Sequence, residues 1–375
     1  MQKTGTVIVG AGLAGLYAAH LLEKRGVKDI VLLEARETLG GRIVSTSPEQ
    51  PAFPAAEMAG FDLGPSWFWP GFQHQMAALV QTLGLQAFAQ FEQGDMLIER
   101  SSAMAVQRVQ GFVNSPPSMR LVGGMQALTQ ALYQSLENTR VMFGQPVQAL
   151  HRAASYVEVH SQDAHGKRHT LHADQVLLAI PPRLAANLTL SPALPPALSS
   201  QWQNTPTWMA PHAKYVALFD TPFWRTQGLS GEARSLSGPL GEIHDASMPG
   251  GKAALFGFFN TPAATRQRMG NDVLIQECRA QLSRLFGPQS ARPNVDIIKD
   301  WAYESYTTTQ DDRQGSSGQH PTAPAIKAQD GVWSGRLIGI GSEWGQQFPG
   351  YLAGAIEAAS AGVDAILEAQ SPGWM

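Results

Sequence analysis

The chain of 375 residues contains a single cysteine, Cys278, which excludes an intrachain disulfide and a cysteine-rich metal site. It also lacks an excess of positive charge: the formal net charge of −3 argues against a nucleic-acid partner. No apolar run approaches the roughly 18 residues of a membrane helix, and the amino terminus has no secretory pattern. We therefore expect a cytoplasmic protein with no membrane partner. The length favours two domains.

The first strand-like segment leads directly into a glycine-rich turn. In "VIVGAGLAGL" (7–16), apolar β-formers precede Gly10, Gly12 and Gly15, and helical spacing follows. Gly10 allows a tight turn, Gly12 lets the backbone approach a pyrophosphate, and Gly15 lets the helix pack closely on the strand. The helix N-terminus would face the phosphate charge. The pattern predicts a βαβ unit that binds a dinucleotide.

The residues after the second strand indicate which dinucleotide. An apolar run over 30–33 ends in Glu34, which can accept hydrogen bonds from ribose hydroxyls and so disfavours NADP. NAD and FAD both remain possible on this fingerprint. Gly40, Gly41 and Arg42 then provide a second close-approach glycine pair and a guanidinium, which suit a longer and deeply buried cofactor. FAD is therefore favoured.

The combination E-A-R-x-x-x-G-G-R (34–42) resembles the flavin-containing amine oxidase family, meaning monoamine oxidase and its relatives. Further segments resemble the family in chain order: "FDLGPSWFWPG" (61–71), "RLVGGMQALTQAL" (120–132), "QPVQALHR" (145–152), "QVLLAIPP" (175–182), "KDWAYESY" (299–306) and "RLIGIGSEWGQQFPGYLAGAIEAASAGVDAIL" (336–367). The resemblance implies an α/β fold, with a glutathione-reductase-like, Rossmann-type FAD domain and a second α+β substrate domain. The predicted FAD domain comprises 1–70, 120–185 and 330–375, and the substrate domain comprises 71–119 and 186–329.

The resemblance also implies residue roles. Lys214, in "AKYVALFDTPFWR" (213–225), matches the lysine that holds a water against flavin N5, and Tyr351 and Trp67 are expected as aromatic residues beside the ring. We predict these three as catalytic. The helix that begins near Gly350 would direct its N–H groups toward the flavin N1–C2=O edge. The predicted cofactor-binding residues are Gly10, Gly12, Ala14, Gly15, Glu34, Ala35, Arg36, Gly41, Arg42, Gly64, Pro65, Ser66, Trp67, Val147, Ala179, Trp301, Tyr306, Gly341, Ser342, Glu343, Gly350, Tyr351, Leu352 and Ala355.

The same resemblance suggests the chemistry. It implies hydride transfer to flavin from the carbon beside a neutral amine, imine hydrolysis and reoxidation by dioxygen, so the expected partners are a small amine or amino acid and dioxygen. Relatives with covalent flavin have a cysteine where this chain has Gln310, which predicts non-covalent FAD. Of the aromatic pair that flanks the amine in monoamine oxidases, Tyr351 matches one member and the other position is Asp311. Asp311 can pair with a cationic group, but an exposed loop carboxylate is the favoured interpretation.

Two alternative functions stay open, and the sequence also supports expectations about a surface loop, Cys278 and metal binding. The alternatives are a C–C desaturase or ring oxidase of the same superfamily, and a flavin-binding protein without turnover, which a short segment before "LVGG" (121–124) keeps open. Polar residues 310–325 predict a long surface loop, and a lid is possible there. We expect Cys278 to pack inside a helix. We expect no metal site: His165, His169 and His172 fall in a predicted surface hairpin.

Overall fold

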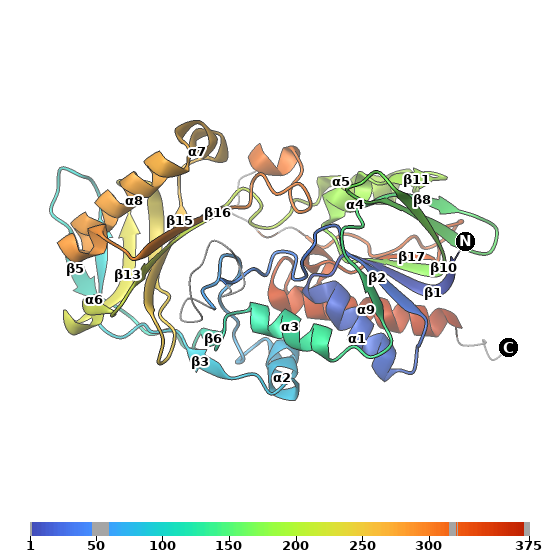
Figure 1. The fold of residues 1–375 in the computed structure, drawn as a ribbon, viewed down its shortest axis with the longest axis horizontal. Helices are drawn as coiled ribbons and strands as arrows, with labels where there is room; N and C mark the ends of the chain where they lie inside the picture. The colour runs from blue at the N-terminus through green and yellow to red at the C-terminus, as the bar shows by residue number, and fades with distance from the viewer. Residues whose placement is uncertain (1, 47–59, 315–319, 321, 371–375) are drawn as a thin grey trace. The chain divides into compact units, whose positions relative to one another are not determined.

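A computed structural model describes residues 2–46, 60–314, 320 and 322–370 (Figure 1). The helices and 3₁₀ turns are α1 Leu13–Lys24, α2 His74–Thr82, α3 Gln126–Gln134, α4 Pro182–Ala186, α5 Pro196–Asn204, α6 Phe223–Thr226, α7 Ala263–Met269, α8 Asn271–Phe286, η2 Pro288–Ala291, η3 Asp311–Gln314, η4 Ser342–Trp344 and α9 Leu352–Gln370. The strands are β1 Gln2–Val9, β2 Ile30–Leu33, β3 Ala87–Ala89, β4 Asp95–Glu99, β5 Gln107–Gln110, β6 Met119–Leu121, β7 Arg140–Met142, β8 Val147–Arg152, β9 Val157–Gln162, β10 Arg168–Leu178, β11 Thr189–Ser191, β12 Ala213–Phe219, β13 Leu229–Ser235, β14 Leu240–Asp245, β15 Ala253–Phe259, β16 Val295–Asp300 and β17 Leu337–Gly339.

The chain divides into two compact units. Unit 1 comprises Met1–Arg42, Leu128–Ala210 and Glu304–Met375, and unit 2 comprises Ile43–Ala127 and Pro211–Tyr303. Each unit is described by itself below.

Unit 1 is built on a sheet that has eight strands among the described residues, in the order β11-β8-β9-β10-β1-β2-β7, with β17 also paired to β10. β1 runs parallel to β2 and to β10, and β17 is parallel to the end of β10. All four residues of β2 are buried, which explains why this strand is an unbroken apolar run. α1 packs against α9 (Figure 1). The βαβ unit predicted from the glycine turn is confirmed.

Unit 2 contains a seven-stranded sheet in the described part of the chain, in the order β16-β12-β15-β14-β13-β4-β5. Every residue of β12 is buried, because one face of this strand packs against a cluster that includes α8 and the other against Phe61 and Leu63. Cys278 lies in the first of these clusters with no exposed surface. Its predicted place inside a helix is therefore confirmed.

The bounds of the compact units differ from the predicted domains. Residues 43–70 and 120–127 group with unit 2 rather than with the Rossmann strands, because Phe61 and Leu63 pack against the β12 and β15 side chains. Residues 186–210 group with unit 1, because the fully buried Trp202 of α5 belongs to the core of its sheet. Residues 304–329 also group with unit 1.

Among the described residues, no helix combines the length and the apolar character that crossing a membrane requires.

Candidate functional site

The glycine-rich turn joins β1 to α1 in unit 1, and its three glycines have different surroundings. Gly10 has φ +105°, and a Cβ on it would lie 2.9 Å from the Ala179 carbonyl oxygen. A Cβ on Gly15 would lie 1.9 Å from the Gly10 carbonyl oxygen, so both positions require glycine for packing within the protein. A Cβ on Gly12 would meet nothing closer than the Gly40 carbonyl oxygen, at 3.8 Å. Packing within the protein therefore does not require glycine at this position, which fits the close approach of a ligand.

The end of β2 adjoins this turn. The buried Glu34 carboxylate accepts hydrogen bonds from the backbone N–H of Ala11, at 2.7 Å, and of Arg36, at 2.9 Å. The Gly40 N–H donates to the Ala11 carbonyl, so the second glycine pair lies against the first turn. Gln145 N–H donates to the Glu34 carbonyl and brings the start of β8, near Val147, to the same edge. Glu34, the second glycine pair and the start of β8 therefore all lie beside the glycine-rich turn, where the sequence predicts the nucleotide.

Arg36 links this edge to the segment after β16. Its guanidinium lies 3.2 Å from a carboxylate oxygen of Glu304 and 3.0 Å from the Thr307 hydroxyl. The Tyr306 ring lies 5.6 Å from the guanidinium carbon. Tyr306 is 44% exposed, so the structure places it at the surface of unit 1, beside Arg36. Its predicted contact with flavin stays a prediction.

Arg42 and Glu343 form a bidentate ion pair in unit 1. The guanidinium donates to both carboxylate oxygens, at 2.5 and 2.9 Å, and to the Ser342 hydroxyl at 2.8 Å. The backbone N–H of Trp208 also donates to the Glu343 carboxylate. Burial acts to raise the pKa of Glu343, but the charge and hydrogen bonds of Arg42 outweigh it and hold that pKa below its ordinary value. Glu343 is therefore an anion that Arg42 stabilises.

The glycines at the start of α9 lie directly against other protein atoms. Gly350 has φ +83°, and a Cβ on it would lie 2.5 Å from the Trp208 Cβ. A Cβ on Gly354 would lie 2.0 Å from the Phe348 carbonyl oxygen. The small residue at Gly354 therefore admits the preceding loop. Leu352 and Ala355 follow Tyr351 in the first turn, and Ala355 is buried.

Tyr351 belongs to a stack of three rings in unit 1. The His320 ring lies between Trp208, with 3.6 Å between ring centroids, and Tyr351, with 4.5 Å. A His320 ring nitrogen lies 3.0 Å from the Pro349 carbonyl oxygen. Tyr351 therefore has an aromatic neighbour, although it is not at Asp311, where the family pattern would place the second cage residue.

The described part of segment 310–325 is more firmly held than the predicted surface loop. Asp311 is exposed, but the Asp312 carboxylate is buried and accepts from Arg183 at 2.6 Å and from the Thr207 N–H at 2.9 Å. Residues 315–319 and 321 lie outside the described residues, so the possible lid is untested.

Lys214 lies on β12 of unit 2, on the strand face that packs against Phe61 and Leu63. Its Nζ donates to the carbonyl oxygens of Asp62, at 2.9 Å, and Gly64, at 3.0 Å, and to the Ser66 hydroxyl at 2.7 Å. The ammonium also lies 4.0 Å from the centroid of the Phe256 ring. The predicted residues Gly64, Ser66 and Lys214 are thus in direct contact.

Burial dominates the electrostatics around Lys214. It lowers the pKa of Lys214 to about 7, although the Asp62 carboxylate opposes the change and Arg120 adds to it. Burial raises the pKa of Asp62, against the effect of Lys214 and Arg120. Asp62 Oδ1 accepts from Ser45 and from the Met125 N–H, whereas Oδ2 has no hydrogen bond to any described residue. This is a buried cluster of one acid and two bases.

Two predicted tryptophans lie near Lys214. The Trp67 indole N–H donates to Gln90 at 2.8 Å, and its ring packs at 5.4 Å from Phe256, the same ring that faces the ammonium. The Trp301 indole donates to the Leu63 carbonyl oxygen at 3.0 Å. Unit 2 thus brings its predicted site residues, including the intervening Pro65, into one cluster.

Several residues of these arrangements were not predicted. In unit 2 they are Asp62, Arg120 and Phe256, and in unit 1 they are Trp208, His320 and Asp312. Asp62 directly precedes the "LGP" segment, and Phe256 alternates with Phe258 along β15, so both had a weak signal in the sequence. The others contact the site through tertiary packing alone.

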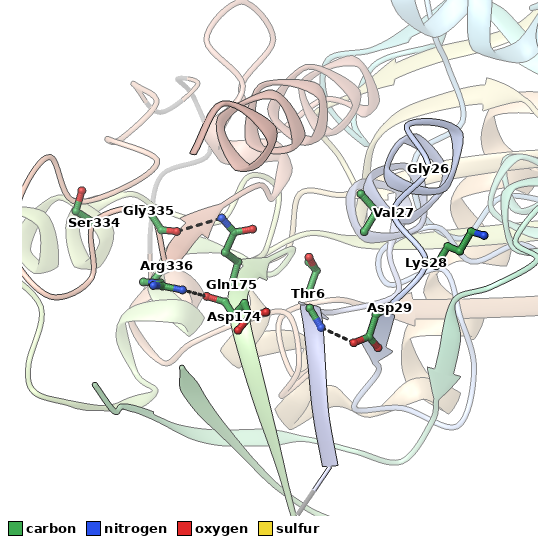
Figure 2. A pocket seen from close by; sticks show the side chains of 11 residues that line it. Thr6, Gly26, Val27, Lys28, Asp29, Asp174, Gln175, Ser334, Gly335 and Arg336 are labelled. Atoms are coloured by element: carbon green, nitrogen blue, oxygen red, sulfur yellow. Dashed lines mark hydrogen bonds between the residues drawn. The ribbon is translucent and has the colours of Figure 1, made fainter. Parts of the chain in front are cut away.

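A pocket of about 760 Å³ in unit 1 is a different feature (Figure 2). It is lined by residues 5, 6, 26–29, 174, 175 and 334–336. Asp29 and Arg336 directly precede β2 and β17, so the pocket lies at the amino ends of these parallel strands. Nucleotides bind beyond the carboxyl ends of such strands. The pocket is therefore not the dinucleotide site.

Comparison with known proteins identifies the class. A family model described as "Flavin containing amine oxidoreductase" matches residues 86–367, and one described as "NAD(P)-binding Rossmann-like domain" matches residues 8–83. The first match covers well over half of the chain, so the chain belongs to the flavin-containing amine oxidoreductase family. The predicted family and fold class are confirmed, and membership implies a flavin cofactor.

Three individual proteins show how similar the chain is to known amine oxidases. A probable flavin-containing monoamine oxidase A of Dictyostelium discoideum is 27% identical over 64% of this chain, and the match spans only 51% of that protein. A putrescine oxidase of Kocuria rosea is 23% identical over 80% of this chain and 82% of its own length. The solved structure of a putrescine oxidase bound to putrescine has 20% identity and a TM-score of 0.78, covering 98% of this chain and 99% of that one. At this identity the structural match establishes the fold alone.

Proposed function

We propose that this protein is an FAD-dependent oxidoreductase that oxidises the C–N bond of a small amine or amino acid, with dioxygen as the electron acceptor. The observation that supports this best is that packing within the protein does not require glycine at Gly12, whereas it does at Gly10 and Gly15 of the same turn. The N-terminus of α1 and the buried Glu34 carboxylate adjoin Gly12 and suit a pyrophosphate and a ribose.

Bound FAD would supply the hydride acceptor, and the residues around it would bind, orient and exclude water. Gly12 and the first N–H groups of α1 would hold the pyrophosphate. Glu34 would accept a further hydrogen bond from a ribose hydroxyl beside those from the N–H groups of Ala11 and Arg36, because a carboxylate offers about four acceptor sites. Arg42, held in place by Glu343, would contact the polar part of FAD that connects its adenine ring to its flavin ring.

Lys214 would act as the proton-handling group. Three oxygen acceptors fix its Nζ, and a pKa of about 7 lets that atom hold or release a proton near neutral pH. These properties support the role implied by the resemblance, in which Lys214 holds a water at flavin N5. Trp67 of unit 2 and Tyr351 of unit 1 each offer an aromatic ring, and an apolar neighbour of this kind would help to keep a substrate amine uncharged.

Non-covalent attachment of FAD is supported by the chemistry of the only cysteine. Cys278 is fully buried in the apolar cluster around α8, and burial raises its pKa well above the ordinary value. A buried, protonated thiol is a poor nucleophile. Gln310 occupies the position at which covalent relatives have their cysteine. FAD should therefore be released intact when the protein is denatured with acid.

One experiment tests the proposal. The purified protein is scanned for flavin absorbance, and then mixed anaerobically with monoamines, putrescine, amino acids and polycyclic alkenes while bleaching is followed. Bleaching by an amine or amino acid, with peroxide and ammonia formed on readmission of air, is the expected result. Bleaching by alkenes alone would indicate the desaturase alternative. Bleaching by no compound would favour a flavin-binding protein without turnover.

Gly12→Ala separates cofactor binding from folding. The added methyl group has 3.8 Å of clearance within the protein, so the variant should fold with an unchanged unfolding midpoint when no flavin is present. It should nevertheless bind FAD at least about tenfold more weakly, because it fills the space for the pyrophosphate. Unchanged FAD affinity, measured by flavin fluorescence quenching, would place the cofactor elsewhere.

A further inference from the structure

One face of the unit 1 sheet gathers histidines around a glutamate. In the antiparallel register, His151 on β8 is directly opposite Glu158 on β9, and Glu158 is directly opposite His172 on β10. His160 is two residues beyond Glu158 and therefore on the same face. The alternate residues, such as Val159, are buried in the core. These four side chains thus lie together on the face away from the core.

The distances in this cluster fit a metal ion. Ligand atoms of His151, Glu158 and His160 all lie within 4.8 Å of one another. Glu158 Oε2 is 3.3 Å from His160 Nε2 and 3.8 Å from His151 Nδ1. Tetrahedral zinc with bonds of roughly 2.0–2.2 Å separates its ligand atoms by about 3.3–3.6 Å. Small rotations of the half-exposed side chains would therefore complete the coordination.

The ring orientation of His160 supports this assignment. Its Nδ1 is 3.0 Å from the Thr170 hydroxyl, the side chain directly opposite on β10. A metal-binding histidine typically uses its second ring nitrogen in such an outer contact. His160 Nε2 is buried and makes no hydrogen bond with any described residue, although Glu158 lies close to it. The same is true of His172 Nε2, which is 3.8 Å from the other Glu158 oxygen.

We propose that His151, Glu158 and His160 bind a divalent transition metal ion of the zinc class. Two imidazole nitrogens and one carboxylate favour zinc, copper or nickel over calcium or magnesium, which prefer oxygen ligands. His172 Nε2 or a water would take the fourth position. The ion links β8 to β9, and through His172 also to β10, so its role is to stabilise the sheet. The proposal is independent of the proposed oxidase activity and changes the expectation that the chain has no metal site.

Titration of the full, tag-free chain with zinc chloride tests the proposal. After treatment with EDTA and removal of the chelator, calorimetry should give one zinc per chain at micromolar concentration or below, and zinc should raise the midpoint of thermal unfolding. His160→Gln and Glu158→Gln should each weaken zinc binding at least about tenfold. His165→Ala, which changes an exposed residue in the turn of the same hairpin, should bind zinc as the wild type does.

Cobalt chloride provides a second readout, because a tetrahedral cobalt site absorbs visible light and His160→Gln should abolish that absorption. Circular dichroism and the unfolding midpoint in EDTA establish that each variant is folded. Zinc binding only at millimolar concentration, or equal affinity in the wild type and both glutamine variants, would overturn the proposal. A loss of binding in His165→Ala equal to that in His160→Gln would place the ion on the loop and would also overturn it.

Discussion

Replacing Lys214 with methionine removes a buried charge while keeping a similar volume, and its effect on stability should change sign with pH. At about 1.4 kcal/mol per pH unit, lowering the pKa of Lys214 from 10.5 to about 7 means that its surroundings, burial above all, disfavour the charged form by about 5 kcal/mol net. The three hydrogen bonds of Nζ offset this by about 1 kcal/mol each. In the wild type, the cost of burying the charge and the stabilisation by the hydrogen bonds therefore have opposite effects on the free energy of unfolding.

Proton linkage gives the direction. Between pH 7 and 10.5 the unfolded chain holds the Lys214 proton and the folded chain does not, so the free energy of unfolding of the wild type rises with pH across this window. The full penalty applies at and below pH 7. Lys214→Met lacks both the penalty and the hydrogen bonds. It should be more stable than the wild type by about 2 kcal/mol at pH 7 and less stable by a similar amount at pH 10, with a crossover near about pH 8.5.

Urea denaturation followed by tryptophan fluorescence at pH 7, 8, 9 and 10 measures this difference, with equal flavin content in each sample. Lys167→Met changes an exposed lysine in the β9–β10 turn and should track the wild type at every pH. Parallel curves for Lys214→Met and the wild type would refute the reasoning, because Lys214 would then titrate alike in both states. Lys214→Met should also retain FAD but slow flavin reduction or reoxidation, and loss of FAD would mean that the role of Lys214 is misassigned.

Three further predictions concern the surrounding groups. Arg42→Met leaves the fully buried Glu343 carboxylate without its cation, and should lower the free energy of unfolding by about 3–5 kcal/mol; the added change Glu343→Gln should restore part of it, as measured by urea denaturation. The loss from Arg42→Met should shrink as the pH falls and Glu343 becomes protonated. Gly15→Ala places a methyl group 1.9 Å from the Gly10 carbonyl oxygen, so the variant should be insoluble or unfolded by circular dichroism, in contrast to Gly12→Ala. Asp62→Asn removes the carboxylate that raises the pKa of Lys214, so the pH dependence of flavin oxidation by air should shift to lower pH; a shift to higher pH would contradict this electrostatic assignment.

The sequence was most informative where function depends on backbone shape. The turn at Gly10 and Gly15 could be predicted because each glycine answers a steric demand that recurs wherever a strand meets a helix at a dinucleotide. The β2 strand and Glu34 at its end followed from the spacing. Gly354 shows what the sequence does not decide: a small residue in a first helical turn admits either a ligand or a loop, and only the fold shows that it admits Phe348.

The residues that were missed share a physical cause. Asp62, Arg120 and Phe256 act on Lys214 from segments far apart in the chain, and the weak local signals at Asp62 and Phe256 do not show that these segments meet. The metal-ligand candidates were missed for a related reason. His151 and Glu158 are adjacent only through the β8–β9 register, which is set by the position of the turn between these strands, and that turn was not predicted from the sequence.

The placement of Lys214 itself argues for a chemical rather than a structural role. The other residues of β12 are buried and, apart from the Tyr215 hydroxyl that donates to Asp296, apolar, and both faces of the strand are packed. A methionine or leucine at this position would fill the same volume without the desolvation of an ammonium. The carbonyl oxygens of Asp62 and Gly64 compensate only part of that cost near neutral pH. A group whose burial lowers stability but brings its pKa to about 7 is suited to handling protons, in agreement with the role proposed for Lys214.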